Sequence, residues 1–163
     1  MTKLTTRQAK PEDIGQIHAC LADLAAYLGE TDLFQLTPEN LQIHGFGDTP
    51  SFSVLIGEKD QTVAGICLYF KTFSTWFGTP GIYVQDLYIK PEFRNHQFGE
   101  KLLAAAAREA STFGATHLRL SVDRSNTQAM AFYDRLGMSK QNKEQIRMLD
   151  GLDFENLAEA TAD

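Results

Sequence analysis

The chain has 163 residues, 43% of them hydrophobic, and this size and composition predict a single domain, residues 1–163, with a core of its own. No apolar run approaches the length of a membrane span, and the start lacks the apolar stretch of a signal peptide, so we expect a cytoplasmic protein with no membrane partner. The formal net charge of −6 argues against general nucleic-acid binding.

The first part of the chain predicts one strand and two helices. Lys3–Gln8 has the pattern of a short strand, and Pro11 then opens a helix that Gly29 closes. The apolar residues of this helix share one stripe: Ile14, Ile17, Leu21, Leu24 and Leu28. Thr37 is expected to cap a second, shorter helix with Pro38 at its first position, ending near residues 45–47.

The middle of the chain predicts three strands and a long helix. Ser51–Ile56 and Thr62–Phe73 are rich in β-branched and aromatic residues, and the polar residues 58–61 join them as a hairpin. A loop over residues 74–80 leads into the strand Gly81–Ile89. A helix follows from about Gln97 to Phe113, where the next residue is a glycine that ends it.

The last part predicts a strand at Thr116–Val122, a helix that Asn126 begins, a strand near Gln145–Leu149 and a tail helix at Asp153–Ala160. This order predicts an α/β fold, a mixed and largely antiparallel central sheet flanked by helices. A P-loop or Rossmann fold is disfavoured, because neither glycine motif is present and an antiparallel meander precedes the central helix.

Cysteines and histidines give no sign of a disulfide or a metal. Cys20 falls in a helical pattern and Cys67 in an apolar strand, so we expect two buried, reduced thiols. The histidines are scattered without metal-ligand spacing: His18, His44, His96 and His117. We therefore predict no metal.

Charge is distributed unevenly. From Pro11 to Glu58 there is no Lys or Arg, so this stretch is acidic and suits a cation. Basic residues gather farther on: Lys90, Arg94, Lys101 and Arg108. There the strand breaks at Lys90-Pro91 and a helix starts across a turn with Arg94 and Gly99. Free N–H groups at a helix start favour a bound phosphate. An ordinary connection with a solvated arginine explains this segment equally well.

A second segment adds to the turn. The element order, the turn Arg94-Asn95-His96-Gln97-Phe98-Gly99 and the segment Asn126-Thr127-Gln128-Ala129-Met130-Ala131-Phe132-Tyr133-Asp134-Arg135-Leu136-Gly137-Met138 together resemble the GCN5-related N-acetyltransferase (GNAT) superfamily over nearly the whole chain. The stretch Tyr69-Phe70-Lys71-Thr72-Phe73-Ser74-Thr75-Trp76 and the strand Asp86–Ile89 look most like the spermidine/spermine (diamine) and thialysine acetyltransferase branch.

The resemblance implies an acetyl-CoA-dependent N-acetyltransferase with a primary amine of a small cationic molecule as acceptor. Acetyl-CoA would lie in a V-shaped splay between the strand at 81–89 and the strand at 116–122. The implied cofactor contacts are Leu87, Tyr88, Ile89, Arg94, Asn95, His96, Gln97, Phe98, Gly99, Glu100 and Asn126. The amine would attack the thioester directly, and Tyr133 would protonate the leaving thiolate. Family precedent also implies a homodimer.

The turn departs from the family pattern Arg-Gly-x-Gly-x-Gly, of which only Gly99 remains as a glycine. A side chain at 95 or 97 costs about 1 kcal/mol if the backbone there needs a positive φ. Asn95 tolerates that conformation best, and Gln97 is expected to sit in helical geometry, where no glycine is obligatory. We expect binding of coenzyme A to persist.

Position 85 is the other departure, because the branch carries a glutamate proposed as general base and this chain has Gln85. An alkyl amine with a pKa of about 10.4 is almost entirely protonated at pH 7. Forming the neutral amine that attacks the thioester therefore adds roughly 4 to 5 kcal/mol to the activation free energy. Asp86 would take the proton if a bulge turns it to the same face. Otherwise Gln85 would orient a water, or the acceptor nitrogen would be less basic.

The acceptor site and several roles stay open at this point. Candidate contacts to the cationic acceptor are Asp23, Tyr27, Glu30, Trp76 and Asp86. Spacing alone favours Tyr133 as a packing aromatic and Asn126 as a plain helix cap. The lost glycines and Gln85 suit a coenzyme A-binding module with little transferase activity, and a protein or peptide amine is another possible acceptor.

Overall fold

The computed structural model describes residues 4–160, so Lys3, the first residue of the predicted first strand, lies outside the described residues. The chain divides into two compact units, one up to Asp123 and the other from Arg124, and each is described by itself. The single domain expected from the sequence therefore stays a prediction. Among the described residues no helix has the length and apolar character needed to cross a membrane.

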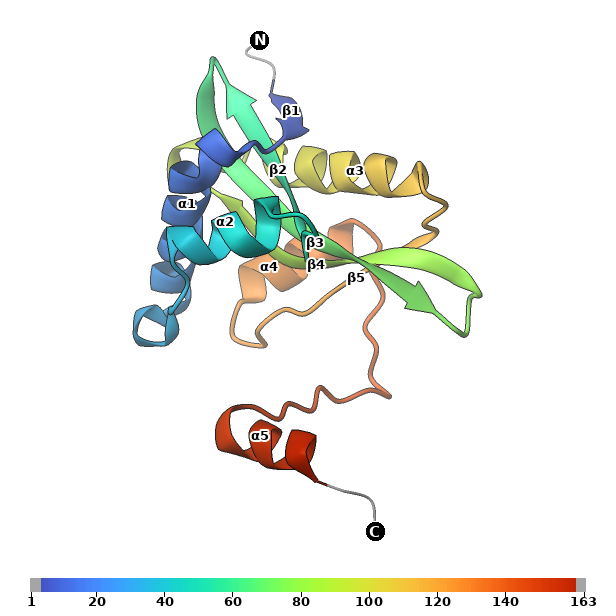
Figure 1. Ribbon diagram of the computed structural model, residues 1–163. Coiled ribbons are helices and arrows are strands. Elements are labelled where there is room, and N and C mark those ends of the chain that lie inside the picture. Colours follow the sequence, from blue (N-terminus) through green and yellow to red (C-terminus); the bar gives the residue numbers. More distant parts are fainter. Residues whose placement is uncertain (1–3, 161–163) are drawn as a thin grey trace. The chain divides into compact units, whose positions relative to one another are not determined.

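The first unit is built on a five-stranded sheet with the order β1-β2-β3-β4-β5 (Figure 1). The strands are β1 (Thr5–Gln8), β2 (Ser53–Lys59), β3 (Thr62–Ser74), β4 (Thr79–Ile89) and β5 (His117–Leu120). Neighbouring strands from β1 to β4 pair antiparallel, and β5 pairs parallel with β4. The predicted mixed, largely antiparallel sheet flanked by helices is confirmed.

Three α-helices belong to the same unit: α1 (Ile14–Leu28), α2 (Pro38–Phe46) and α3 (Phe98–Ser111). Short 3-10 turns occupy Pro11–Asp13, Thr31–Leu33 and Pro91–Phe93. Gly29 ends α1 with a left-handed φ of 72°. The Thr37 side chain accepts a hydrogen bond from the Asn40 N–H at 3.1 Å, so the predicted cap of α2 is confirmed.

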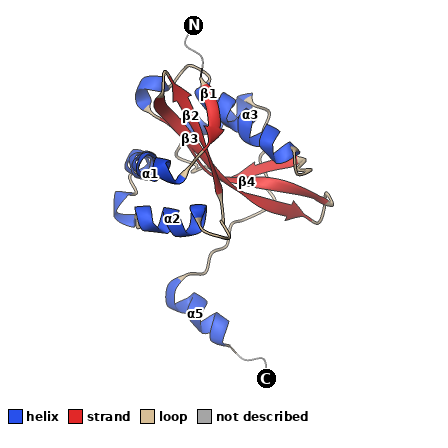
Figure 2. Cartoon of the chain, turned by 45° about the horizontal axis from the view of Figure 1, so that its top comes forward, coloured by secondary structure: helices blue, strands red, loops and turns tan. Residues whose placement is uncertain are grey.

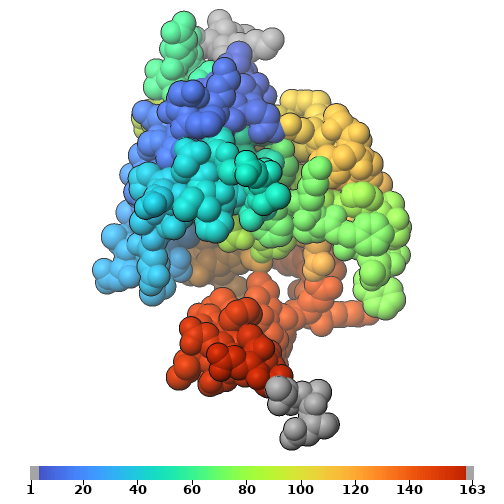
Figure 3. Space-filling view, viewed as in Figure 1, coloured from blue at the N-terminus to red at the C-terminus, as the bar shows by residue number. Residues whose placement is uncertain are grey.

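The helices cover both faces of the sheet, α1 and α2 on one and α3 on the other (Figure 2). Under α1 and α2 lies the main buried cluster, which joins Ile17 and Leu41 to Ile66, Leu68 and Tyr88 of the sheet. In the space-filling view α1 and α2 form one continuous surface over that face (Figure 3). On the other face Phe98 of α3 packs against a smaller cluster. Cys20 and Cys67 are buried and free, as predicted.

A β-bulge interrupts the pairing of β3 with β4. Leu68 lies opposite Asp86 while the next residue, Tyr69, lies opposite Val84, so Gln85 is the extra residue on β4. Because β3 alternates regularly from Ile66 to Phe70, Leu68 and the residues two positions before and after it share one face. The bulge therefore puts Asp86 on the α1 side of the sheet and leaves Val84 on the α3 side.

The second unit contains α4 (Thr127–Arg135) and α5 (Gly151–Glu159). The predicted strand at Gln145–Leu149 is wrong, because these residues form no ladder in the structure. Ile146 and Met148, which should have faced a core, are 78% and 82% exposed. Alternating apolar residues make a strand only where a neighbouring strand supplies hydrogen bonds, and the described part of this unit has none.

Candidate active site

An opening lies between β4 and β5. The parallel pairing runs from Gly81 opposite His117 to Val84 opposite Leu120 and ends there, whereas β4 continues to Ile89. Among the described residues no strand pairs with Gln85–Ile89 on the β5 side. The predicted splay is thus present, with β5 ending two residues before the predicted Val122.

The backbone of β4 faces this opening with two residues. The Lys90 N–H donates to the Ala64 carbonyl of the neighbouring chain segment at β3, at 2.9 Å. In a strand the N–H and C=O of one residue point to one side and those of the next residue to the other. The main-chain groups of Leu87 and Ile89 therefore point away from β3, toward the opening.

The turn after β4 has an unusual backbone. Asn95 and Gln97 both have left-handed backbones, with φ of 63° and 61°. The expectation of helical geometry at Gln97 is wrong, because Gln97 is the N-cap that precedes α3 and must reverse the chain into the helix. The first hydrogen bond there runs from the Lys101 N–H to the Gln97 carbonyl at 3.0 Å, so the N–H groups of residues 98–100 precede it at the helix tip.

Arg94 turns its side chain toward α1. Its Nε donates to the Ile89 carbonyl at 2.9 Å. Its guanidinium lies over the rings of Tyr27 and Tyr88, 4.9 and 5.7 Å from their centroids. The arginine thus ties the turn to β4 and to the end of α1, and it brings Tyr27, a predicted acceptor contact, next to the turn.

Asp86 is a carboxyl of the first unit whose pKa is raised, in contrast to Asp13, whose pKa is lowered by its hydrogen bond with Arg7. Desolvation by burial raises the pKa of its carboxyl to about 6. Burying a carboxylate is costly, and such groups gather at functional sites. The neighbouring Gln85, the bulged residue, is exposed.

The other predicted site residues belong to several elements of both units. Trp76 is 94% exposed in the turn between β3 and β4, and Asp23 and Glu30 are exposed in and just after α1. Tyr133 and Asn126 belong to the second unit. There the Asn126 side chain accepts a hydrogen bond from the Ala129 N–H at 3.1 Å, so it caps α4. Tyr133 is half-buried on that helix.

Two aromatic residues near the opening were missed by the sequence analysis. Phe70 and Tyr83 stack with ring centroids 5.2 Å apart and planes at 24°. The Tyr83 hydroxyl is hydrogen-bonded to that of Ser121 at 2.6 Å, just past the last pair of β4 and β5. Regular strand alternation predicts that Tyr83 and Asp86 lie on opposite faces. The sequence would predict them on one face only if the bulge were assigned to Gln85.

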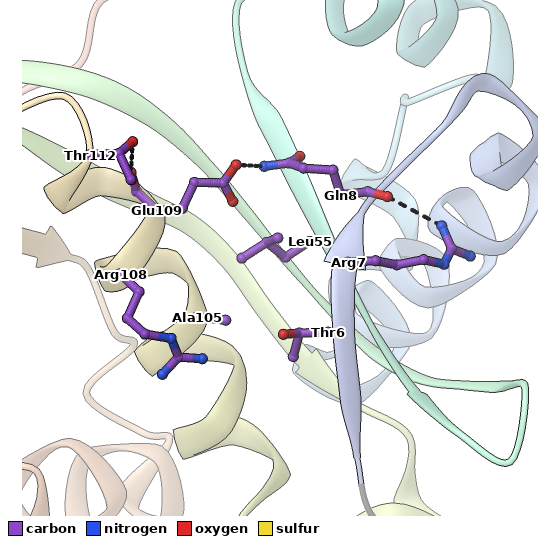
Figure 4. A pocket seen from close by; sticks show the side chains of 8 residues that line it. All are labelled: Thr6, Arg7, Gln8, Leu55, Ala105, Arg108, Glu109 and Thr112. Carbon is purple, nitrogen blue, oxygen red and sulfur yellow. Dashed lines mark hydrogen bonds between the residues drawn. The ribbon is translucent and has the colours of Figure 1, made fainter.

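A pocket of about 370 Å³ lies elsewhere, between the β1 edge of the sheet and α3 (Figure 4). Within its lining Gln8 donates to Glu109, and Arg7 pairs with Asp13 and Glu58, which lie outside the lining. Among residues 4–160 no group of three His, Cys, Asp or Glu side chains is arranged to hold a metal ion. The opening beside β4 remains the candidate site.

The turn predicts a stability change at Gln97. Gln97→Gly should raise the free energy of unfolding by about 0.5 to 1 kcal/mol. Glycine removes the steric cost of the left-handed backbone in the folded state, and the greater conformational entropy of glycine in the unfolded chain cancels part of this gain. Urea unfolding followed by circular dichroism measures it. The matched control Glu100→Gly, in the helical first turn of α3, should lower stability by about 1 kcal/mol. A loss of stability in Gln97→Gly would contradict this account of the turn.

Asp86 predicts a pH-dependent change. A carboxyl whose folded pKa lies above its unfolded value destabilises the fold once pH rises past both, so Asp86→Asn should raise stability above pH 6 and change it little below pH 4. We expect a gain of about 1 to 3 kcal/mol at pH 8. Calorimetric melting at both pH values measures it, with the exposed Asp48→Asn as a control. An equal effect at both pH values would refute the desolvation of Asp86.

Comparison with known proteins identifies a family and several relatives of this chain. The model of the Acetyltransferase (GNAT) family matches residues 17–138. The thialysine N-epsilon-acetyltransferase of Bos taurus is 35% identical over 145 residues, which cover 84% of this chain and 85% of that protein. A putative ribosomal protein bS18-alanine N-acetyltransferase of Bacillus subtilis is 28% identical and covers 84% of this chain and 82% of that protein.

Solved structures share the fold at low identity. An integron cassette protein from the mobile metagenome of V. cholerae has a TM-score of 0.81 at 17% identity, covering 98% of this chain and 100% of that one. An aminoglycoside N-acetyltransferase in complex with CoA has a TM-score of 0.73 at 14% identity, covering 93% and 97%. The chain belongs to the GNAT family of N-acetyltransferases, and its relatives support the diamine and thialysine branch.

Proposed function

We propose that the protein transfers the acetyl group of acetyl-CoA to a primary amine of a small cationic acceptor, a polyamine, diamine or lysine analogue. One observation carries the proposal: the half of β4 that β5 leaves unpaired has main-chain groups facing the opening, is followed by the turn that leads into α3, and carries a carboxyl of raised pKa. The three parts match the needs of a thioester arm, a diphosphate and a protonated amine.

The residues present fit acetyl-CoA. Leu87 would offer its N–H and carbonyl to an amide-containing arm, and Ile89 its N–H, because the Ile89 carbonyl already accepts a hydrogen bond from Arg94. Tyr88 lies between them. The N–H groups from Phe98 to Glu100 and the turn Arg94–Gln97 would hold the diphosphate at the tip of a fourteen-residue helix. The left-handed backbones show that the turn keeps a glycine-like path without glycines at 95 and 97. Bound acetyl-CoA supplies the electrophilic thioester carbon.

Proton removal is assigned to Asp86. Gln85 has no basic site, while Asp86 on the same strand has a pKa raised to about 6 and is ionised above that pH. A base with this pKa is better matched to an ammonium group at neutral pH than an ordinary aspartate. Gln85, exposed on the bulge, would orient the water or amine beside it.

Tyr133 is proposed as the acid that protonates the leaving thiolate. A phenol with a pKa near 10 stays protonated until a thiolate with a conjugate-acid pKa of about 8.5 leaves. Asn126 would hydrogen-bond near the thioester end in addition to capping α4. Both roles rest on the match of residues 126–138 to the family.

The acceptor class is supported by charge and by the relatives. Asp23, Glu30 and Asp86 supply negative charge, and Tyr27 and Trp76 supply aromatic faces for a cation. The bovine relative bears the name of a thialysine acetyltransferase. A peptide amine is the second candidate, favoured by the alanine acetyltransferase relative in Bacillus subtilis.

Assembly and location are proposed with the function. The family match spans both units, which supports one functional domain. A homodimer is supported by large apolar side chains exposed in the second unit: Ile146, Met148, Leu152, Phe154 and Leu157. A cytoplasmic location agrees with the free thiols of Cys20 and Cys67.

Two measurements test the function. Titrating acetyl-CoA by calorimetry should show binding, and thiol release should follow the addition of diamines, polyamines or lysine analogues. Binding without amine-dependent thiol release would instead identify a coenzyme A-binding module. Acetylation of peptides but not of small amines would identify the second candidate.

Tyr133→Phe should lower kcat for the preferred amine about a hundredfold while acetyl-CoA affinity stays within twofold, because only the transition state needs the phenol proton. Steady-state kinetics and calorimetry on the same preparation measure both. Wild-type kcat in this variant would remove Tyr133 from the mechanism.

The pH profile tests Asp86. In the wild type kcat/KM should fall as pH drops below about 6, since the carboxyl is then protonated and cannot accept a proton. Asp86→Asn should have a low kcat/KM and lack this acidic limb. An acidic limb of unchanged position in the variant would assign it to another group.

A further inference from the structure

We infer that the stacked pair Phe70 and Tyr83 is an acceptor subsite, which receives the carbon chain of a cationic amine whose reacting nitrogen lies at Asp86. This inference rests on the proposed function and adds a substrate contact to it. The inference is based on the bulge at Gln85, which places the side chains of Phe70, Tyr83 and Asp86 on one face of the sheet.

The three residues share a face because of the pairing of β3 with β4. Leu68 lies opposite Asp86, and Phe70, two residues on, lies opposite Tyr83. Residues two apart on a strand point the same way and are separated by roughly 7 Å. The aromatic pair therefore neighbours the carboxyl along the sheet, at a distance that several methylene groups bridge.

This face changes character along β3. Leu68 and Tyr88 belong to the buried cluster beneath α1 and α2, whereas Phe70 and Tyr83 are half-buried. Figures 1 and 2 show the β3–β4 hairpin running on past these two helices. The two rings thus form an apolar surface next to an acid, rather than part of the main core.

The rings are held in place before any ligand arrives. Their planes are 24° apart, and the Tyr83 hydroxyl is fixed by its 2.6 Å hydrogen bond to Ser121. With its polar tip satisfied, Tyr83 offers its ring as contact area, and rigid aromatic rings lose little entropy on binding. A carbon chain with a cationic nitrogen matches a surface with an apolar part and a negative end.

Chain length is the variable that tests the subsite. A series of α,ω-diamines from 1,2-diaminoethane upward is assayed with wild type, Phe70→Leu and Tyr83→Leu. In the wild type kcat/KM should rise about two- to fourfold per methylene while the added carbons contact the rings. Both variants should flatten this rise and leave the KM for acetyl-CoA within twofold.

Matched variants separate the ring from other effects. Tyr83→Phe keeps the ring and should keep the dependence on chain length, although it loses the bond to Ser121. Phe73→Leu, an exposed aromatic of the same strand whose side chain points to the opposite face, should also keep it. Folding of each variant is checked by circular dichroism.

The outcomes are distinct. If Phe70→Leu and Tyr83→Leu retain the wild-type dependence on chain length, or lose activity equally for short and long diamines, the subsite is refuted and the proposed function stands. If the wild type acetylates no diamine, polyamine or lysine analogue and binds none of them by calorimetry, both the subsite and the proposed function fall. A flattened chain-length dependence confined to the two ring variants supports the subsite.

Discussion

The extra residue at Gln85 is the constraint on which the site depends. By breaking the alternation of β4, it turns Asp86 toward α1 and leaves Val84 toward α3. It also coincides with the point where β5 stops pairing, so the strand changes face and loses its neighbour within two residues. Without the bulge, β4 could continue to pair with β5 and close the opening. Tyr83 and Asp86 would then lie on opposite faces of the sheet.

The turn after β4 has side chains at 95 and 97, where the family pattern Arg-Gly-x-Gly-x-Gly has glycines. Two non-glycine residues are left-handed there, each at a cost of about 1 kcal/mol or more. Arg94 offsets part of this cost, because its side chain bonds the Ile89 carbonyl and stacks on tyrosines of α1 and β4. The arginine side chain thereby helps to hold the turn in place. In the proposed function, the main-chain N–H groups at the start of α3 would bind the diphosphate.

Sequence patterns predicted most of the fold because its elements carry local signals. Thr37 before Pro38 marks the start of α2, and Gly29 marks the end of α1. Alternating apolar and polar residues mark β5, although β5 ends two residues earlier than predicted. The strand near Gln145–Leu149 could not be judged locally, since a strand exists only with a partner that the sequence does not name. The left-handed Gln97 and the Phe70–Tyr83 pair depend on chain reversal and on register, which are tertiary properties. The pKa of Asp86 likewise follows from burial that residue type does not reveal.

The position of Trp76 affects how this protein can be studied. It is the chain's one tryptophan, and at 94% exposure its indole is already in water in the folded state. Intrinsic fluorescence at long excitation wavelengths will therefore report the tip of the β3–β4 hairpin and change little when the core melts. The same indole is a reporter for whatever covers that tip, because a shift of its emission to the blue requires that water be displaced from it.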